Sequence, residues 1–97
     1  MLFIVFNTDK SNSAELRDAT RAAHLAYLKE AGSKVKIGGP TVGADGKSNG
    51  GVMVIEADSL DEARSFASAD PFAKAGLFDS TVIRQWKWMT GNPDPAR

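Results

Sequence analysis

The stretch GVMVIEADSLDEARSFASAD, residues 51–70, contains the strand and the helix that decide the fold. Its first part, Gly51–Ala57, is apolar at nearly every position, which is typical of a strand covered on both faces. Ser59 and Glu62 follow with the spacing of a capping box, so a helix is predicted to begin there and to end at Asp70, which precedes a proline. The helix is expected to turn its apolar residues toward the sheet: Leu60, Ala63, Phe66 and Ala67.

The start of the chain has the same strand–helix pattern. Leu2–Phe6 is apolar at every position and predicts a second strand with two covered faces. A helix is expected next, capped within residues 11–13 and ending at Ala31, because Gly32 is a favourable residue just beyond a helix end. On a helical wheel, one apolar stripe is formed by Leu16, Ala19, Ala23, Ala26 and Tyr27.

Two more strands complete the expected order. Residues 34–37 alternate lysine with β-branched residues and predict a half-exposed strand, whereas the Gly- and Asp-rich residues 38–51 are interpreted as a loop. Residues 80–89 are interpreted as the last strand. The order β-α-β-β-α-β is typical of the ferredoxin-like α+β fold, a four-stranded antiparallel sheet with two helices on one face. We therefore expect one domain at residues 1–89 and a flexible tail at residues 90–97.

One face of the predicted sheet has no helix to cover it. Leu2–Phe6 and Gly51–Ala57 nevertheless carry apolar side chains on both faces, and a chain of 97 residues has a limited core of its own. The simplest cover is the same face of a second copy, so we expect a homodimer joined sheet to sheet, alone or within a higher assembly. Trp86 and Trp88 are expected to fill the core between the two sheets.

Composition argues against several classes of function. The 12 basic and 12 acidic residues give a formal net charge of zero, so the chain lacks the positive charge of a nucleic-acid-binding protein. It has no cysteine and therefore no thiolate nucleophile and no disulfide. The opening apolar run is much shorter than the roughly 20 residues of a membrane-spanning helix. We expect a cytoplasmic protein without nucleic-acid or membrane partners.

His24 is the single histidine and the one side chain expected to titrate near neutral pH. Asp70 is the acid whose position local structure does not explain, because a carboxylate at the end of a helix faces the negative end of the helix dipole. A functional His24–Asp70 pair is one interpretation. The alternative is that His24 packs at the border of the apolar stripe and that the Asp-Pro pair only forms a turn.

Other polar features are less informative. A single histidine without cysteine offers too few ligands for a metal site, and we expect no cofactor. Gly38, Gly39 and Pro40 lack the glycine and lysine pattern of a phosphate loop, so a tight turn is the simpler interpretation. Arg17 and Arg21 lie one turn apart and could hold an anion, although arginines on a helix surface are usually just solvated.

Three segments resemble motifs of the YCII-related (YciI-like) family of the dimeric α+β barrel superfamily: RAAHLAYL at residues 21–28, GGP at 38–40 and ADPFAKAGLF at 69–78. The resemblance covers nearly the whole chain. It implies the ferredoxin-like fold and a dimer formed through the sheets. It also implies an active site built from the family's His and Asp, which fall here on His24 and Asp70.

The resemblance implies further site residues and a class of reaction. The residues at motif positions that we assign to substrate binding are Arg21, Gly39, Pro40 and Phe72. The reactions of the family are largely unassigned, and one related branch removes halide from a chlorinated hydroxylated aromatic. Phe3 departs from the family at a position where an aromatic hydroxyl often appears, so any role of that hydroxyl is absent here.

The residues and the resemblance together predict a small cofactor-free enzyme. His24 would act as general acid or base, Asp70 would orient it, and Arg21 would attract a small anionic or phenolic molecule. Lyase, isomerase or dehydrohalogenase chemistry fits such a site. Two alternatives stay open: a module that binds a small molecule without turnover, and a structural dimer in which His24 and Asp70 tie the two helices together.

Overall fold

The computed structural model describes residues 1–93, and residues 94–97 of the expected tail lie outside this part. In chain order the elements are β1 (Leu2–Asp9), α1 (Ala14–Ala31), the 3-10 turn η1 (Gly32–Lys34), β2 (Val35–Val42), β3 (Ser48–Glu56), α2 (Leu60–Ser68), α3 (Pro71–Lys74) and β4 (Phe78–Trp86). The predicted order of strands and helices is confirmed, and the short helix α3 is additional. None of the helices within the described residues has the length and apolar character needed to cross a membrane.

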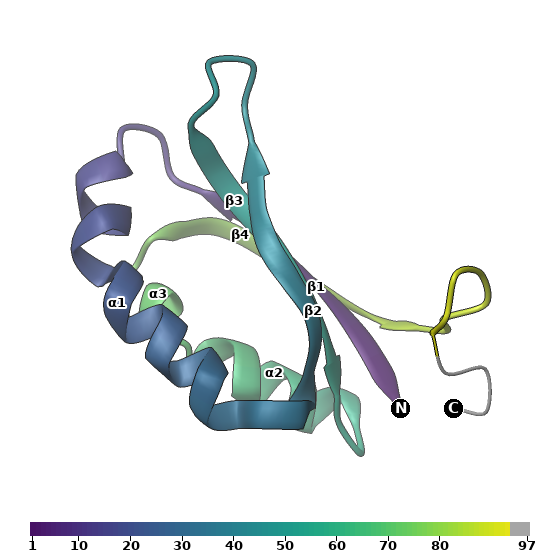
Figure 1. Ribbon diagram of the computed structural model, residues 1–97. Coiled ribbons are helices and arrows are strands. Elements are labelled where there is room, and N and C mark those ends of the chain that lie inside the picture. Colours follow the sequence, from purple (N-terminus) through teal and green to yellow (C-terminus); the bar gives the residue numbers. More distant parts are fainter. Residues whose placement is uncertain (94–97) are drawn as a thin grey trace.

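The four strands form one antiparallel sheet in the order β2-β3-β1-β4. β1 pairs with β3 on one side and with β4 on the other, so the first and last strands of the chain are neighbours. The helices lie together on one side of this sheet (Figure 1). The arrangement is the ferredoxin-like α+β fold that the sequence predicted. β4 begins at Phe78 and ends at Trp86, so the expected range of 80–89 was displaced toward the C-terminus.

The stretch interpreted as a loop, residues 38–51, is mostly strand, and that interpretation was wrong. β2 and β3 extend into it from both ends, so the turn between them is only residues 43–47. Glycines weaken an isolated strand, but here they are paired, as Gly39 is with Val52. The partner strand supplies backbone hydrogen bonds that local sequence preference does not reveal.

Alternation along β1 assigns its side chains to the two faces of the sheet. Phe3, Val5 and Asn7 are buried on the side of the helices, whereas Phe6 on the other side is 44% exposed. Within a single chain, the first strand is therefore not fully covered on both faces. The core beneath the helices is formed by Phe3, Val5, Met53, Ile55, Ala57, Ala63 and Ala67.

The capping box that begins α2 is half formed. The Ser59 hydroxyl oxygen accepts a hydrogen bond from the backbone N–H of Glu62 at 3.1 Å. The carboxylate of Glu62 accepts from the backbone N–H of Asp58, at 3.1 Å, rather than from that of Ser59. The inward residues of α2 are those predicted, except that Leu60 is exposed.

The orientation of α1 differs from the expectation. Of the predicted apolar stripe only Tyr27 is partly buried, and the other members are exposed: Leu16, Ala19, Ala23 and Ala26. The partly buried side instead contains Arg17, His24 and Tyr27, each of which makes a hydrogen bond to another element. These polar contacts fix the rotation of α1, because leaving such groups buried without partners would cost more than exposing alanine methyl groups.

Gly50 should be intolerant of any side chain. A Cβ atom there would overlap the backbone oxygen of Asn7 and lie 2.9 Å from the Thr41 hydroxyl oxygen. We expect Gly50→Ala to lower the free energy of unfolding by about 1–3 kcal/mol through overpacking. Gly38→Ala is the matched control, because its Cβ would make only ordinary contacts, the nearest at 3.5 Å to Met53. Urea unfolding at equal protein concentration measures both, and equal stability of the two variants would contradict the prediction.

Candidate functional site

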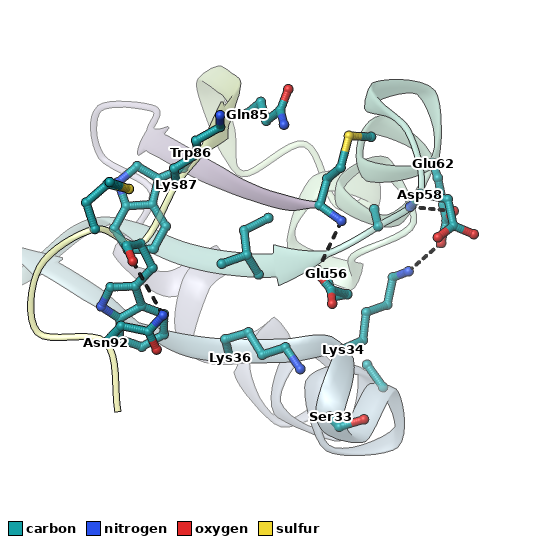
Figure 2. Close-up of a pocket in the computed structure, with 16 residues that line it drawn as sticks. Ser33, Lys34, Lys36, Glu56, Asp58, Glu62, Gln85, Trp86, Lys87 and Asn92 are labelled. Atoms are coloured by element: carbon teal, nitrogen blue, oxygen red, sulfur yellow. Dashed lines mark hydrogen bonds and ion pairs between the residues drawn. The ribbon is translucent and has the colours of Figure 1, made fainter. Parts of the chain in front are cut away.

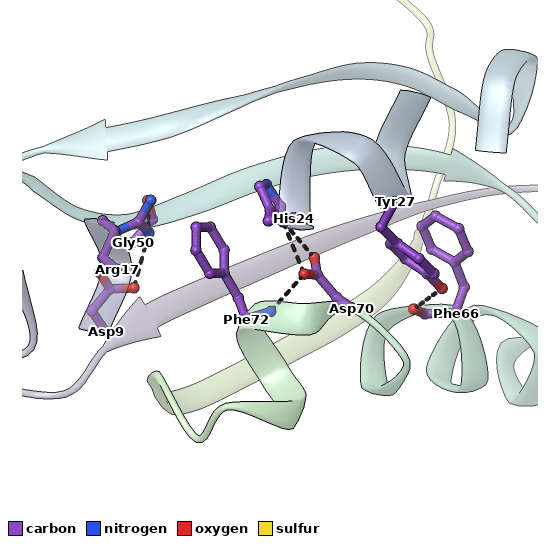
Figure 3. Close-up of polar contacts among 8 residues, drawn as sticks. All are labelled: Asp9, Arg17, His24, Tyr27, Gly50, Phe66, Asp70 and Phe72. Carbon is purple, nitrogen blue, oxygen red and sulfur yellow. Dashed lines mark hydrogen bonds and ion pairs between the residues drawn. The ribbon is translucent and has the colours of Figure 1, made fainter. Parts of the chain in front are cut away.

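His24 and Asp70 are joined by a short hydrogen-bonded contact between α1 and the start of α3. Nδ1 of His24 lies 2.8 Å from Oδ1 and 2.9 Å from Oδ2 of Asp70 (Figure 3). The Asp70 side chain is 1% exposed and that of His24 is 18% exposed. A carboxylate only accepts hydrogen bonds, so it favours the tautomer with the proton on Nδ1. Nε2 is then the nitrogen that remains for a ligand.

Asp70 also begins α3, which corrects the expectation that its position is unfavourable. It is the N-cap residue of α3, and its Oδ1 accepts a hydrogen bond from the backbone N–H of Phe72 at 2.9 Å. Aspartate is among the best N-cap residues, and Pro71 suits the first position of a helix. The Asp-Pro pair therefore ends α2 and starts a second helix, and the sequence reading had recognised only the first of these roles.

Phe72 holds the imidazole of His24 from the side. The two rings are stacked, with centroids 4.0 Å apart and an angle of 16° between their planes. The guanidinium carbon of Arg17 lies 4.7 Å from the Phe72 centroid, and Figure 3 shows Phe72 between Arg17 and His24. Phe78 meets the Phe72 ring edge-on, with centroids 6.0 Å apart. The ring stack and the Asp70 contact together restrict the imidazole to one orientation.

Arg17 is fixed by a two-pronged ion pair that the sequence reading missed. Its Nε lies 2.7 Å from Oδ2 of Asp9, and its Nη2 lies 3.0 Å from Oδ1. The same Nη2 donates to the backbone oxygen of Gly50 at 3.0 Å. Arg17 had been interpreted as solvated, because nothing in a helical pattern reveals a partner on the preceding strand. Asp9 compensates its charge, so Arg17 acts here as an anchored wall of the site.

Tyr27 ties α1 to α2 beside the His24–Asp70 pair. Its hydroxyl donates a hydrogen bond to the backbone oxygen of Phe66 at 2.8 Å. Burial, and to a smaller extent the negative charge of Asp70, raises the pKa of Tyr27 above its usual value. The hydroxyl therefore stays protonated at neutral pH and keeps its role as a donor.

One cavity of about 570 Å³ contains every residue that the sequence analysis assigned to the site. Those residues are His24, Asp70, Arg21, Gly39, Pro40 and Phe72. The cavity lies between α1 and the β2–β3 part of the sheet, where Gly38 and Gly51 stand opposite Met53 and Asn7 without side chains of their own. None of the ion pairs within residues 1–93 involves Arg21, so its charge is available to an anionic ligand. The roles of these residues stay predictions.

A second cavity, of about 840 Å³, lies at the other end of the sheet (Figure 2). It is lined by the ion pair of Lys34 with Glu62, at 2.8 Å, and by the neighbouring rings of Trp86 and Trp88. It contains no histidine and none of the predicted site residues. Within the described residues, no group of three or more His, Cys, Asp or Glu side chains could hold a metal ion. The smaller cavity is therefore the better candidate for chemistry.

Asp70 should contribute to stability through its cap as well as to any chemistry. Asp70→Ala removes the N-cap oxygen and the partner of His24, and we expect it to lower the free energy of unfolding by about 1–3 kcal/mol. Asp70→Asn keeps an oxygen at the cap and should cost clearly less. Urea unfolding compares the two variants, with Asp79→Ala as an exposed control. Equal losses for Asp70→Ala and Asp70→Asn would show that the negative charge, and not the cap, carries the contribution.

Comparison with solved structures gives one likeness that extends over the site. The chain is 43% identical to 5-chloro-2-hydroxyhydroquinone dehydrochlorinase (TftG) from Burkholderia phenoliruptrix AC1100, a structure solved in complex with 2,5-dihydroxybenzoquinone. The TM-score is 0.85, and the match covers 90% of this chain and 94% of that one.

Curated proteins and family models give a consistent result. The chain is 30% identical to Protein YciI of Escherichia coli O6:H1, over 90% of this chain and 97% of that protein. It is 35% identical to the uncharacterized protein YjpA of Bacillus subtilis, over 89% and 92% of the two chains. The model of the YCII-related domain matches residues 1–87. With the fold, these matches confirm the resemblance, and the chain belongs to the YCII-related domain family.

Proposed function

We propose that the protein is a small enzyme that uses His24 and Asp70 for acid–base chemistry on a hydroxylated aromatic or quinone ring, with removal of HCl from a chlorinated ring as its reaction. The observation that carries this proposal is the buried carboxylate beside a half-buried imidazole, both lining one cavity. The 43% identity to a dehydrochlorinase supports the class of reaction. A cavity of about 570 Å³ is within the usual range for small-molecule sites.

The reaction requires a proton to be moved twice. Loss of HCl from a chlorinated hydroxyquinol to give a hydroxyquinone moves one hydroxyl proton to the chlorine-bearing carbon. A second hydroxyl proton is then released as the C–Cl bond breaks and chloride leaves. The change is redox-neutral overall, so one acid–base group can serve both steps. His24 would exchange these protons at Nε2, while Asp70 stabilises the imidazolium that forms in between.

The surroundings of His24 suit a flat, electron-rich ring. Phe72 and Phe78 present aromatic surface in the cavity, and Gly38 and Gly51 leave its floor without side chains. Arg21 would attract a phenolate or chloride by its uncompensated charge.

Chloride release tests the proposed reaction. With 5-chloro-2-hydroxyhydroquinone as substrate, we expect the protein to release chloride and His24→Gln to lower the rate by about 100-fold or more, the usual effect of a general acid–base group. A chloride-selective electrode measures the reaction, and Lys29→Ala, at an exposed position of the same helix, is the control. Saturable binding of 2,5-dihydroxybenzoquinone without chloride release would instead favour a binding module.

We also propose that the open face of the sheet joins two copies of the chain. This face carries exposed apolar side chains at Phe6, Ile37 and Val82, from three different strands. Trp86, which pairs with Leu2 across the strands, lies on the same face. Exposed apolar area of this kind is usually covered by a partner. The same face of a second copy supplies a matching surface by two-fold symmetry.

A charge at the centre of this face should break the dimer. Light scattering of the protein at micromolar concentration should give about twice the 10.3 kDa mass of the chain. Phe6→Lys should produce a monomer or unfolded protein, because it places a charge among apolar side chains. Ala22→Lys, on an exposed position of α1, should leave the mass unchanged. A stable monomer of the unaltered chain would contradict this proposal.

A further inference from the structure

Asn7 is a polar side chain buried in the middle of an apolar strand. It is 7% exposed and faces the helices together with Phe3 and Val5. Burying an amide is unfavourable unless its hydrogen-bonding groups find partners. An apolar residue would continue the core at this position, so the amide calls for an explanation.

One end of the amide has a partner and the other faces the cavity. Oδ1 of Asn7 accepts a hydrogen bond from the hydroxyl of Thr81, at 2.7 Å, on the neighbouring strand β4. Within residues 1–93 no fully buried side-chain nitrogen or oxygen lacks a partner, yet no protein acceptor is found for Nδ2. Asn7 lines the cavity that contains His24. Nδ2 is therefore the polar atom that Asn7 presents to this space.

The neighbours of Asn7 hold the amide in place and leave it uncovered. Its partner on β3 is Gly51, which has no side chain to lie over the amide. The next residue of β3, Gly50, is packed against the Asn7 backbone oxygen, and its own backbone oxygen accepts from Arg17. Strand pairing on both sides and the Thr81 hydroxyl restrict the amide to one orientation.

We propose that Asn7 is a specificity-determining residue whose Nδ2 donates a hydrogen bond to a carbonyl or phenolate oxygen of the substrate. This inference rests on the proposed function, because the ring that reacts at His24 must carry a second oxygen to reach Asn7. A planar ring with oxygens at both ends, such as 2,5-dihydroxybenzoquinone, meets this requirement, whereas phenol has only one. A donor fixed in the wall of a cavity discriminates well against ligands that lack the matching acceptor.

Calorimetric titration with two ligands tests this role. We expect Asn7→Leu, which has a similar shape but no donor, to weaken binding of 2,5-dihydroxybenzoquinone about 2- to 10-fold, the effect of one neutral hydrogen bond. Binding of phenol should change little, since its single oxygen is taken by His24. Asn7→Asp should weaken the quinone further, because a carboxylate repels an oxygen that bears negative charge. The selective loss for the quinone is the supporting result.

Asn49 offers a matched control. Its Oδ1 also accepts a hydrogen bond from a threonine hydroxyl, that of Thr41 at 2.7 Å, but the pair is exposed and Asn49 does not line the cavity. Asn49→Leu should leave both affinities unchanged. Should Asn7→Leu not fold, Thr81→Val releases the amide without altering Asn7 and is expected to weaken the quinone selectively, though less.

The outcomes separate this inference from the proposed function. Unchanged quinone affinity in the Asn7 and Thr81 variants, or an equal loss for both ligands, would overturn the role of Asn7. If His24→Gln still abolished chloride release in that case, the proposed function would stand. Failure of the unaltered protein to bind the quinone and to release chloride would overturn both.

Discussion

The contact of His24 with Asp70 is the interaction on which the arrangement of the helices depends. Asp70 is almost fully buried and uses its carboxylate twice, for the imidazole on α1 and for the backbone N–H that begins α3. A buried carboxylate is stable only when such partners are present. The same atoms therefore attach α1 to the rest of the chain and set the orientation of the group that would exchange protons.

The cavity exists because polar contacts, and not apolar packing, position α1. Arg17, His24 and Tyr27 each reach a partner on another element, and the alanine-rich side of the helix is turned to solvent. Opposite this helix the sheet has glycine at positions 38 and 51. Where small or absent side chains meet a helix held at a distance, space remains, and that space is bordered by the side chains that hold the helix.

The sequence predicted the element order and the residues of the cavity, because strand runs, a capping box and short motifs are local signals. It did not predict the rotation of α1, since Asp9 and Gly50, the partners of Arg17, lie on strands far from it in the fold's pairing pattern. The extent of β2 and β3 was missed for a similar reason: glycine-rich strands are stabilised by their neighbours. Asn7 gave no signal, because an isolated asparagine in an apolar run has no periodicity.

A cavity beneath α1 has a consequence for assembly. Space between helix and sheet removes apolar contacts that would otherwise stabilise a small chain, which has little core to spare. At the same time the other face of the sheet carries apolar side chains that no helix covers, among them Phe6 and Val82. Covering that face with a second copy would return the lost apolar burial without filling the site. In the proposed dimer, the sheet would therefore bind a partner on one face and leave room for a ligand on the other.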